Sequence, residues 1–123
     1  MPVMTKDPGL EALLDLHGQT FVEDGGYWYK IEAWRVAPST ERPHGIRYNL
    51  TFHNKWNQRL FGFDNAHAVA EKAGGRFSGR RMVYDHRHLS PQDKGTPYGF
   101  SSAQQLLTDF FDEVNRFMQE VGQ

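Results

Sequence analysis

The sequence predicts an α+β domain: a small antiparallel β-sheet with an N-terminal helix and a long C-terminal amphipathic helix packed on one face. Two observations carry this prediction. Residues 46–53 alternate apolar and polar side chains, as in a strand with one buried face. Residues 103–121 carry apolar side chains at helical spacing. The apolar stripe of such a helix needs a partner, and the apolar face of the sheet supplies it.

The first third of the chain predicts a short helix and a hairpin. Asp7-Pro8 has the form of an N-cap followed by proline in the first turn, and Gly18 suits the helix end. Residues 20–23 and 27–36 are expected to be strands around the turn at residues 24–26. On the second strand, alternation separates one apolar face from another that carries the tryptophans.

The later elements are less regular. Residues 37–43 contain two prolines and predict a loop, and residues 59–63 predict a strand that ends at Asp64. We expect a helical turn or two within residues 66–72, a strand at residues 81–86 and a loop at residues 89–99. The C-terminal helix begins after Ser101 or Ser102, where Gln104 or Gln105 three places on completes a capping box.

Length and composition predict one domain, residues 1–123, with an aromatic-rich core. The 123 residues include 9 Phe, 5 Tyr and 3 Trp but no cysteine, so disulfides and thiolate metal sites are excluded. No apolar run reaches the roughly 20 residues of a membrane helix, and the N-terminus does not resemble a secretion signal. We therefore expect a cytoplasmic protein that does not enter the membrane.

Positive charge is concentrated in the middle of the chain. The net charge is −1, yet residues 41–88 contain nine Lys/Arg against four Asp/Glu, and five of the six histidines. Such a region suits a phosphate backbone. The alternative is that these basic side chains are simply solvated on strands and loops.

The motif GFDNAH, residues 62–67, offers a first candidate site at the end of a strand. Asp64 and His67 could form a carboxylate–imidazole pair for general acid–base chemistry, with Asn65 beside them to bind substrate. The alternative is a turn in which Asp64 caps a helix that begins at Asn65.

The motif YDHRH, residues 84–88, offers a second candidate site. Alternation places His86 and His88 on one face of a strand and Arg87 on the other. The two histidines could clamp a metal with Asp64 or His67, or act as acid and base on a phosphodiester whose phosphate the arginines hold. The alternative is a solvated edge strand.

The motif RPHGIRY, residues 42–48, adds His44 and Arg47 near the central strand. Arg47 could clamp a phosphate together with Arg35, or pair across strands with Glu32. Tyr98, Phe100 and Trp34 could stack on bases, although packing against a helix explains Phe100 as well.

These motifs together resemble a known family. HGIRY, GFDNAH and DHRH occur in this order, followed by PYGF before the last helix. From Asp24 onward, the chain resembles the TumE-like toxins of prokaryotic toxin–antitoxin pairs. The resemblance implies a growth inhibitor encoded beside a helix-turn-helix antitoxin. It carries over motif positions but no catalytic roles: His44, Arg47, Asp64, Asn65, His67, Asp85, His86 and His88.

Three functions follow as hypotheses. The first is a toxin that cleaves RNA without a metal or other cofactor. Its acid and base come from His44, His67, His86 and His88. The second is a binding module that inhibits growth by sequestering a target, which the mildly acidic overall charge favours. The third is a metal-dependent hydrolase that uses His86, His88 and Asp64.

Overall fold

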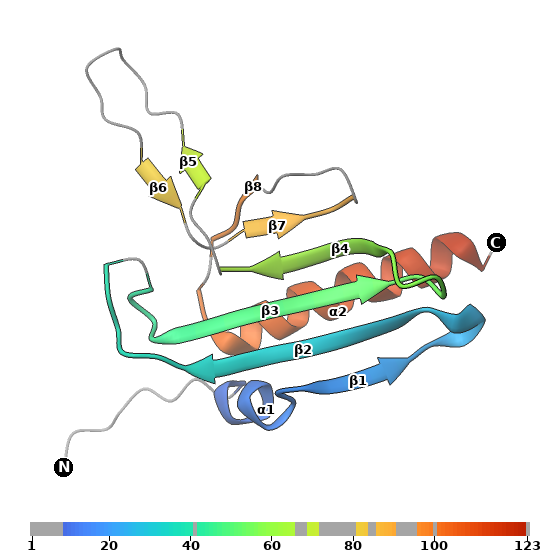
Figure 1. The fold of residues 1–123 in the computed structure, drawn as a ribbon, viewed down its shortest axis with the longest axis horizontal. Coiled ribbons are helices and arrows are strands. Elements are labelled where there is room, and N and C mark those ends of the chain that lie inside the picture. Colours follow the sequence, from blue (N-terminus) through green and yellow to red (C-terminus); the bar gives the residue numbers. More distant parts are fainter. Residues whose placement is uncertain are drawn as a thin grey trace.

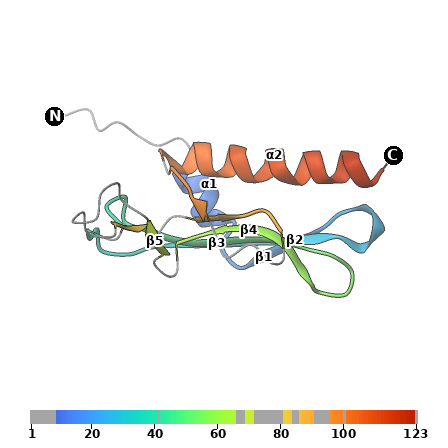
Figure 2. The same ribbon diagram turned by 90° about the horizontal axis from the view of Figure 1, so that it is seen from above.

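A computed structural model gives the fold and describes residues 9–40, 42–65, 69–71, 81–83, 86–90, 96–99 and 101–122. It is the expected α+β arrangement, in which a helix layer covers one face of an antiparallel sheet (Figures 1 and 2). Among the described residues, no helix is long and apolar enough to cross a membrane.

The main sheet contains six strands in the order β1-β2-β3-β4-β7-β8, and all neighbours are antiparallel. The long strand β3 lies in the interior of this sheet (Figure 1). The strands are β1 (Gln19–Val22), β2 (Trp28–Arg35), β3 (Ile46–His53), β4 (Arg59–Asp64), β7 (His86–His88) and β8 (Thr96–Pro97). A separate two-stranded sheet pairs β5 (Val69–Glu71) with β6 (Arg81–Val83).

The helices lie on one side of the main sheet. Helix α2 (Ala103–Val121) runs along it, and the short α1 (Leu10–Asp15) lies on the same side (Figure 2). Ser102 caps α2 by accepting a hydrogen bond from the backbone N–H of Gln105, as the sequence predicts. The side chain of Gln105 donates to Asp109.

The core between α2 and the sheet is largely aromatic. Phe110 of α2 is fully buried and meets Phe63 of β4 and Tyr29 of β2 edge-on. Farther along α2, Phe117 meets Phe52 of β3 edge-on. Edge-to-face packing of this kind adds to the hydrophobic stabilisation from the buried ring area. The alternating apolar residues of β3 are all buried, as expected from the sequence.

Four local predictions need correction. Within residues 66–72, Val69–Glu71 form a strand instead of a helical turn. Residues 81–86 do not form one strand, because Arg81–Val83 pair with β5 whereas His86 begins β7 in the other sheet. Thr96–Pro97 form β8 inside the expected loop. The first helix has Gly9 at its N-cap, and Asp7 lies outside the described residues. In the three corrections that concern strands, pairing with a distant segment decides the structure, which local patterns do not encode.

Asn65 extends the pairing of β3 and β4 by one residue. Its backbone N–H donates to Tyr48 O at 3.2 Å, its side-chain oxygen accepts from Tyr48 N at 2.9 Å, and its amide donates to Ile46 O at 2.7 Å. Arg42 closes the arrangement by donating to Asn65 O through Nε and Nη2 at 3.0 and 2.7 Å. Because Asn65 is fully buried, these groups have no access to water.

Replacement of Asn65 by alanine should therefore destabilise the fold. The substitution leaves a buried N–H and a buried carbonyl without their partner, at about 1–3 kcal/mol each. We expect a loss of roughly 2–5 kcal/mol in the free energy of unfolding, measured by urea denaturation. The matched control is Asn115→Ala on the exposed face of α2, which should cost nothing. Equal stability of Asn65→Ala and wild type would contradict this role.

Candidate active site

The face of the main sheet opposite α2 carries the polar residues of the central strands. We call it the open face, because α2 and α1 lie on the other side (Figure 2). Directly paired residues of an antiparallel sheet point to the same side, so the register defines rows across this face. Among the residues whose side chains the structure describes, the rows are Trp28–His53–Arg59, Lys30–Thr51–Gly62–His88, Glu32–Asn49–Asp64 and Trp34–Arg47.

The central feature of the open face is a buried pair of Asp64 and His88. Asp64 ends β4, and His88 lies on β7 opposite Gly62, one row away. His88 Nε2 lies 2.9 Å from Asp64 Oδ2, and the two side chains are only 3% and 5% exposed. This separation is that of an ion pair, although the ring nitrogen is not aligned for a hydrogen bond.

A buried pair of this kind is costly for the fold. Removing a carboxylate and an imidazolium from water costs several kcal/mol per ion, and their attraction only partly offsets this. An apolar pair of similar volume would often stabilise a fold at least as well. The Asp64–His88 pair is therefore weak evidence for a contribution to stability.

A second polar pair lies on β3. His53 Nε2 is 2.8 Å from the Thr51 hydroxyl, and the His53 ring stacks on Trp28 with centroids 3.9 Å apart. Burial lowers the pKa of His53, and the nearby positive charges of Arg59 and Lys30 lower it further, against a raising contribution from the backbone of Asn57.

Glycine at position 62 makes room between the two polar pairs. A Cβ at Gly62 would lie 2.9 Å from Leu50 O and within 4 Å of the side chains of Thr51 and Arg59. The side chain of Arg59 therefore lies close to Gly62, in the row that leads to His88.

Arg47 lies on the open face against an aromatic ring. Its guanidinium is 5.5 Å from the ring centroid of Trp34, the residue directly opposite on β2. The register places Asn49 opposite Glu32, and Glu32 contacts Lys30 at 3.8 Å. Arg47 is also diagonal to Asp64, and diagonal neighbours in a sheet lie roughly 7–8 Å apart.

Three of the predicted substrate-binding residues lie on the helix side instead. Arg35 contacts Glu11 of α1 at 3.4 Å, so it does not join Arg47 in one site. Arg87 pairs with the core residue Phe63, on the face opposite His88. Tyr98 is buried against Phe63, and its hydroxyl donates to Asp109 of α2.

Of the remaining predicted residues, the structure describes the side chains of His44 and Asn65. His44 lies just before β3, where its Nδ1 accepts from Ile46 N at 3.3 Å. Asn65 is engaged by the β3 backbone. His86 pairs with Asp64 through the β-ladder, but its side chain lies outside what the structure describes. His67, Asp85 and Phe100 lie outside the described residues.

Sequence reasoning singled out the individual residues but did not identify the contact of Asp64 with His88. The expected pairing of Asp64 with His67 stays a prediction, because His67 lies outside the described residues. It also assigned no role to Trp28, Thr51, His53 or Arg59. The alternation of β2 and β3 already placed Trp28 and His53 on polar faces. Only the register of β2 with β3 shows that Trp28 and His53 lie side by side on the same face of the sheet.

The described side chains include no group of three histidines or acidic residues arranged to hold a metal ion. The metal hypothesis needs His86, whose side chain is not among them, so it stays a prediction.

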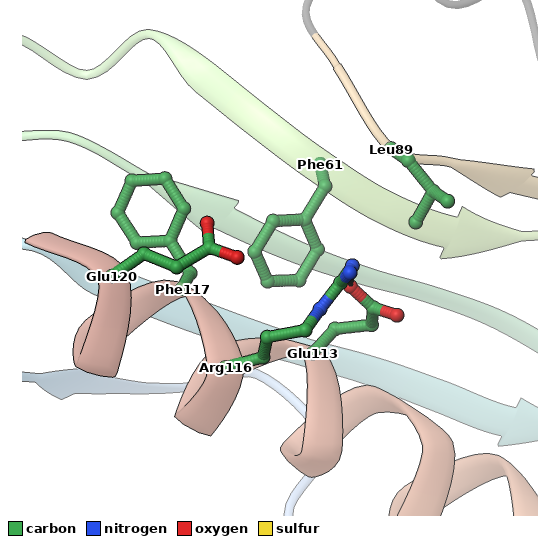
Figure 3. Close-up of a pocket in the computed structure, with 6 residues that line it drawn as sticks. All are labelled: Phe61, Leu89, Glu113, Arg116, Phe117 and Glu120. Carbon is green, nitrogen blue, oxygen red and sulfur yellow. Dashed lines mark hydrogen bonds and ion pairs between the residues drawn. The ribbon is translucent and has the colours of Figure 1, made fainter.

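The pocket drawn in Figure 3 lies away from the open face. It is a hollow of about 110 Å³ between α2 and the β4–β7 side of the sheet, with Phe61 and Phe117 at its base. The ion pair of Glu113 and Arg116 lies on its helix side. We assign no chemistry to this hollow, because it contains neither a histidine nor an unpaired nucleophile among its lining residues.

The lowered pKa of His53 predicts a pH effect on stability. As the pH falls through about 6.5, the unfolded chain binds a proton at His53 before the folded chain does. Stability is therefore fully present above that pH and is lost as the pH falls through the folded pKa. Thermal unfolding between pH 8 and pH 5 should show a smaller loss for His53→Gln than for wild type. Parallel curves would contradict the prediction.

The chain was compared with known proteins. The model of a family described as "Toxin TumE" matches residues 10–118, which is most of the chain. The chain matches none of the curated proteins or solved structures with which it was compared. The match includes β3, β4 and β7, which carry the residues of the open face. The chain therefore belongs to the TumE toxin family and is the toxin of a toxin–antitoxin pair.

Proposed function

We propose that this toxin is a ribonuclease that uses histidine acid–base chemistry, without a metal ion, on the open face of the sheet. The observation that carries the proposal is the buried Asp64–His88 pair at 2.9 Å. A carboxylate beside an imidazole stabilises the protonated form of the ring, which a general base requires.

The reaction class follows from these groups. His88 takes the proton from a ribose 2′-hydroxyl, and the resulting oxygen attacks the adjacent phosphorus. A second acid protonates the departing 5′-oxygen, so the products are a 2′,3′-cyclic phosphate and a free 5′-hydroxyl. Asp64 stabilises the imidazolium that forms in between.

The phosphate needs positive charge on the same face. Arg47 lies diagonal to Asp64, and Lys30 occupies the same row as His88. These cations stabilise the charge that develops on the phosphorane oxygens. Arg87 takes no part in this arrangement, because it belongs to the opposite face of β7.

The histidine that acts as the general acid is one of three candidates. His86 pairs with Asp64 through its backbone, His44 precedes β3, and His67 follows the GFDNAH strand. Alanine at each of these positions distinguishes them, because only loss of the acid abolishes cleavage in a folded protein.

Substitution of the pair is the main test. His88→Gln and Asp64→Asn should each lower RNA cleavage by roughly 10²–10⁴-fold and relieve growth arrest on induced expression. The readouts are total RNA integrity, growth, and cleavage of a defined RNA by the purified protein. Asp112→Asn is the control, because Asp112 is an exposed acid on α2, on the other side of the sheet from the open face. Circular dichroism establishes that each variant is folded.

The outcomes separate the alternatives. If His88→Gln and Asp64→Asn fold and still cleave RNA, the proposed site is wrong. If wild type arrests growth while RNA stays intact, the protein acts as a binding module on another target. Loss of cleavage on adding a chelator would instead support a metal-dependent hydrolase.

Salt dependence gives an independent test of phosphate recognition. Contacts between cations and phosphates release counterions, so the affinity for RNA should fall steeply between about 50 and 200 mM salt. Arg47→Gln should reduce the slope of log affinity against log salt by roughly one contact, measured by fluorescence anisotropy. A binding module with an aromatic interface would show little dependence on salt.

A toxin of this family has an antitoxin as its partner. We propose further that this antitoxin carries a helix-turn-helix DNA-binding domain, as the family resemblance implies, and that the toxin acts in the cytoplasm. Co-expression with the protein encoded beside it should restore growth and yield a stable complex. A neighbouring protein that lacks such a domain but still restores growth would contradict this part.

A further inference from the structure

We infer that the open face binds unpaired nucleobases by stacking on Trp28 and Trp34, so that the substrate is single-stranded RNA lying along β2 and β3. This inference rests on the proposed function, because it adds a binding surface to the proposed ribonuclease site. It uses aromatic residues that the acid–base chemistry leaves without a role.

The two tryptophans lie beside the proposed site, two strands from Asp64 in the order of the sheet. They occupy the two ends of β2 on the same face, six residues apart, which corresponds to roughly 20 Å along a strand. The rows between them contain Thr51, His88, Asn49 and Asp64. A strand of RNA anchored at both ends therefore runs along β2 and lies beside the Asp64–His88 pair, whose two residues lie two and three strands farther across the sheet.

Each tryptophan is already part of a stack. Trp28 lies nearly parallel to the His53 ring, with an interplanar angle of 10°. Trp34 is 37% exposed and has the Arg47 guanidinium over its ring. Rings and guanidinium planes of this kind are the surfaces on which unpaired bases stack.

The charges beside the rings favour a nucleic acid over an apolar protein partner. Lys30, Arg47 and Arg59 all belong to rows of the open face, whereas its acids are Glu32, which contacts Lys30, and Asp64, which contacts His88. Aromatic rings interleaved with cations bind the bases and the phosphates of one strand together.

Stacking depends on unpaired bases and not on the sugar. A duplex hides the faces of its bases, so single-stranded RNA should bind much more tightly than a duplex of the same sequence. Single-stranded DNA should bind about as well as RNA of the same sequence. It cannot be cleaved by the proposed route, because it lacks the 2′-hydroxyl.

The test measures binding and cleavage separately. Binding of the full-length protein to a labelled single-stranded DNA of about 12 nucleotides is followed by fluorescence anisotropy. Trp28→Leu and Trp34→Leu should each raise Kd by about 5- to 150-fold. Trp28→Tyr and Trp34→Tyr are the matched variants. They keep an aromatic ring, so they should stay within a few-fold of wild type.

The outcomes keep this inference distinct from the proposed ribonuclease. If the leucine variants bind DNA as wild type does, or if tyrosine fails to rescue, the stacking surface is wrong even when wild type cleaves RNA. If the leucine variants lose binding and tyrosine restores it, the surface stands even when no RNA is cleaved. Unchanged DNA binding together with lost binding to the antitoxin would assign this face to a protein partner and overturn the inference.

Discussion

The structure depends on one constraint: α2 covers only one face of the main sheet. Its aromatic stripe, centred on the fully buried Phe110, packs against Tyr29 and Phe63, and this burial fixes which side chains of β2, β3 and β4 point inward. Because side chains alternate along a strand, the other half of these residues must form a second surface. The open face is therefore a direct consequence of the helix packing, and its polar composition follows from the alternation of side chains along the strands.

The fold class could be predicted from the sequence because it depends on local periodicity. The alternation of Ile46–His53 and the capped apolar stripe of Ala103–Val121 each contain their own signal, and both elements lie where expected. The short strands were predicted poorly because they depend on distant partners and not on local periodicity. Val69–Glu71 and His86–His88 are only three residues long, and they are strands because partners distant in the sequence pair with them. Periodicity in so short a segment cannot distinguish a strand from a loop or a helical turn.

The candidate site, too, could be predicted from the sequence only in part. The sequence indicated Asp64, His88 and Arg47 as residues of chemical interest, because their types suit acid–base work and phosphate binding. It could not indicate that Asp64 contacts His88, or that Arg35 and Arg87 point to the helix side, since these facts follow from the register of β2 with β3 and of β4 with β7. A shift of one residue in either register would reverse the assignment of every side chain on that strand.

The register itself is held by the motif residues, which explains why three separated motifs belong together. Asn65 of GFDNAH bonds to the backbone of Ile46 and Tyr48 in HGIRY, and its own carbonyl accepts from Arg42 just before that motif. The preceding residue, Asp64, contacts His88 of DHRH. Asn65 thus fixes how β4 lies on β3. In that arrangement the neighbouring Asp64 contacts His88 of β7. The carboxylate of Asp64 can remain buried beside an imidazole because the rigid amide contacts of Asn65 hold the strand end in place. A substitution at Asn65 should therefore disturb the Asp64–His88 pair even in a chain that still folds.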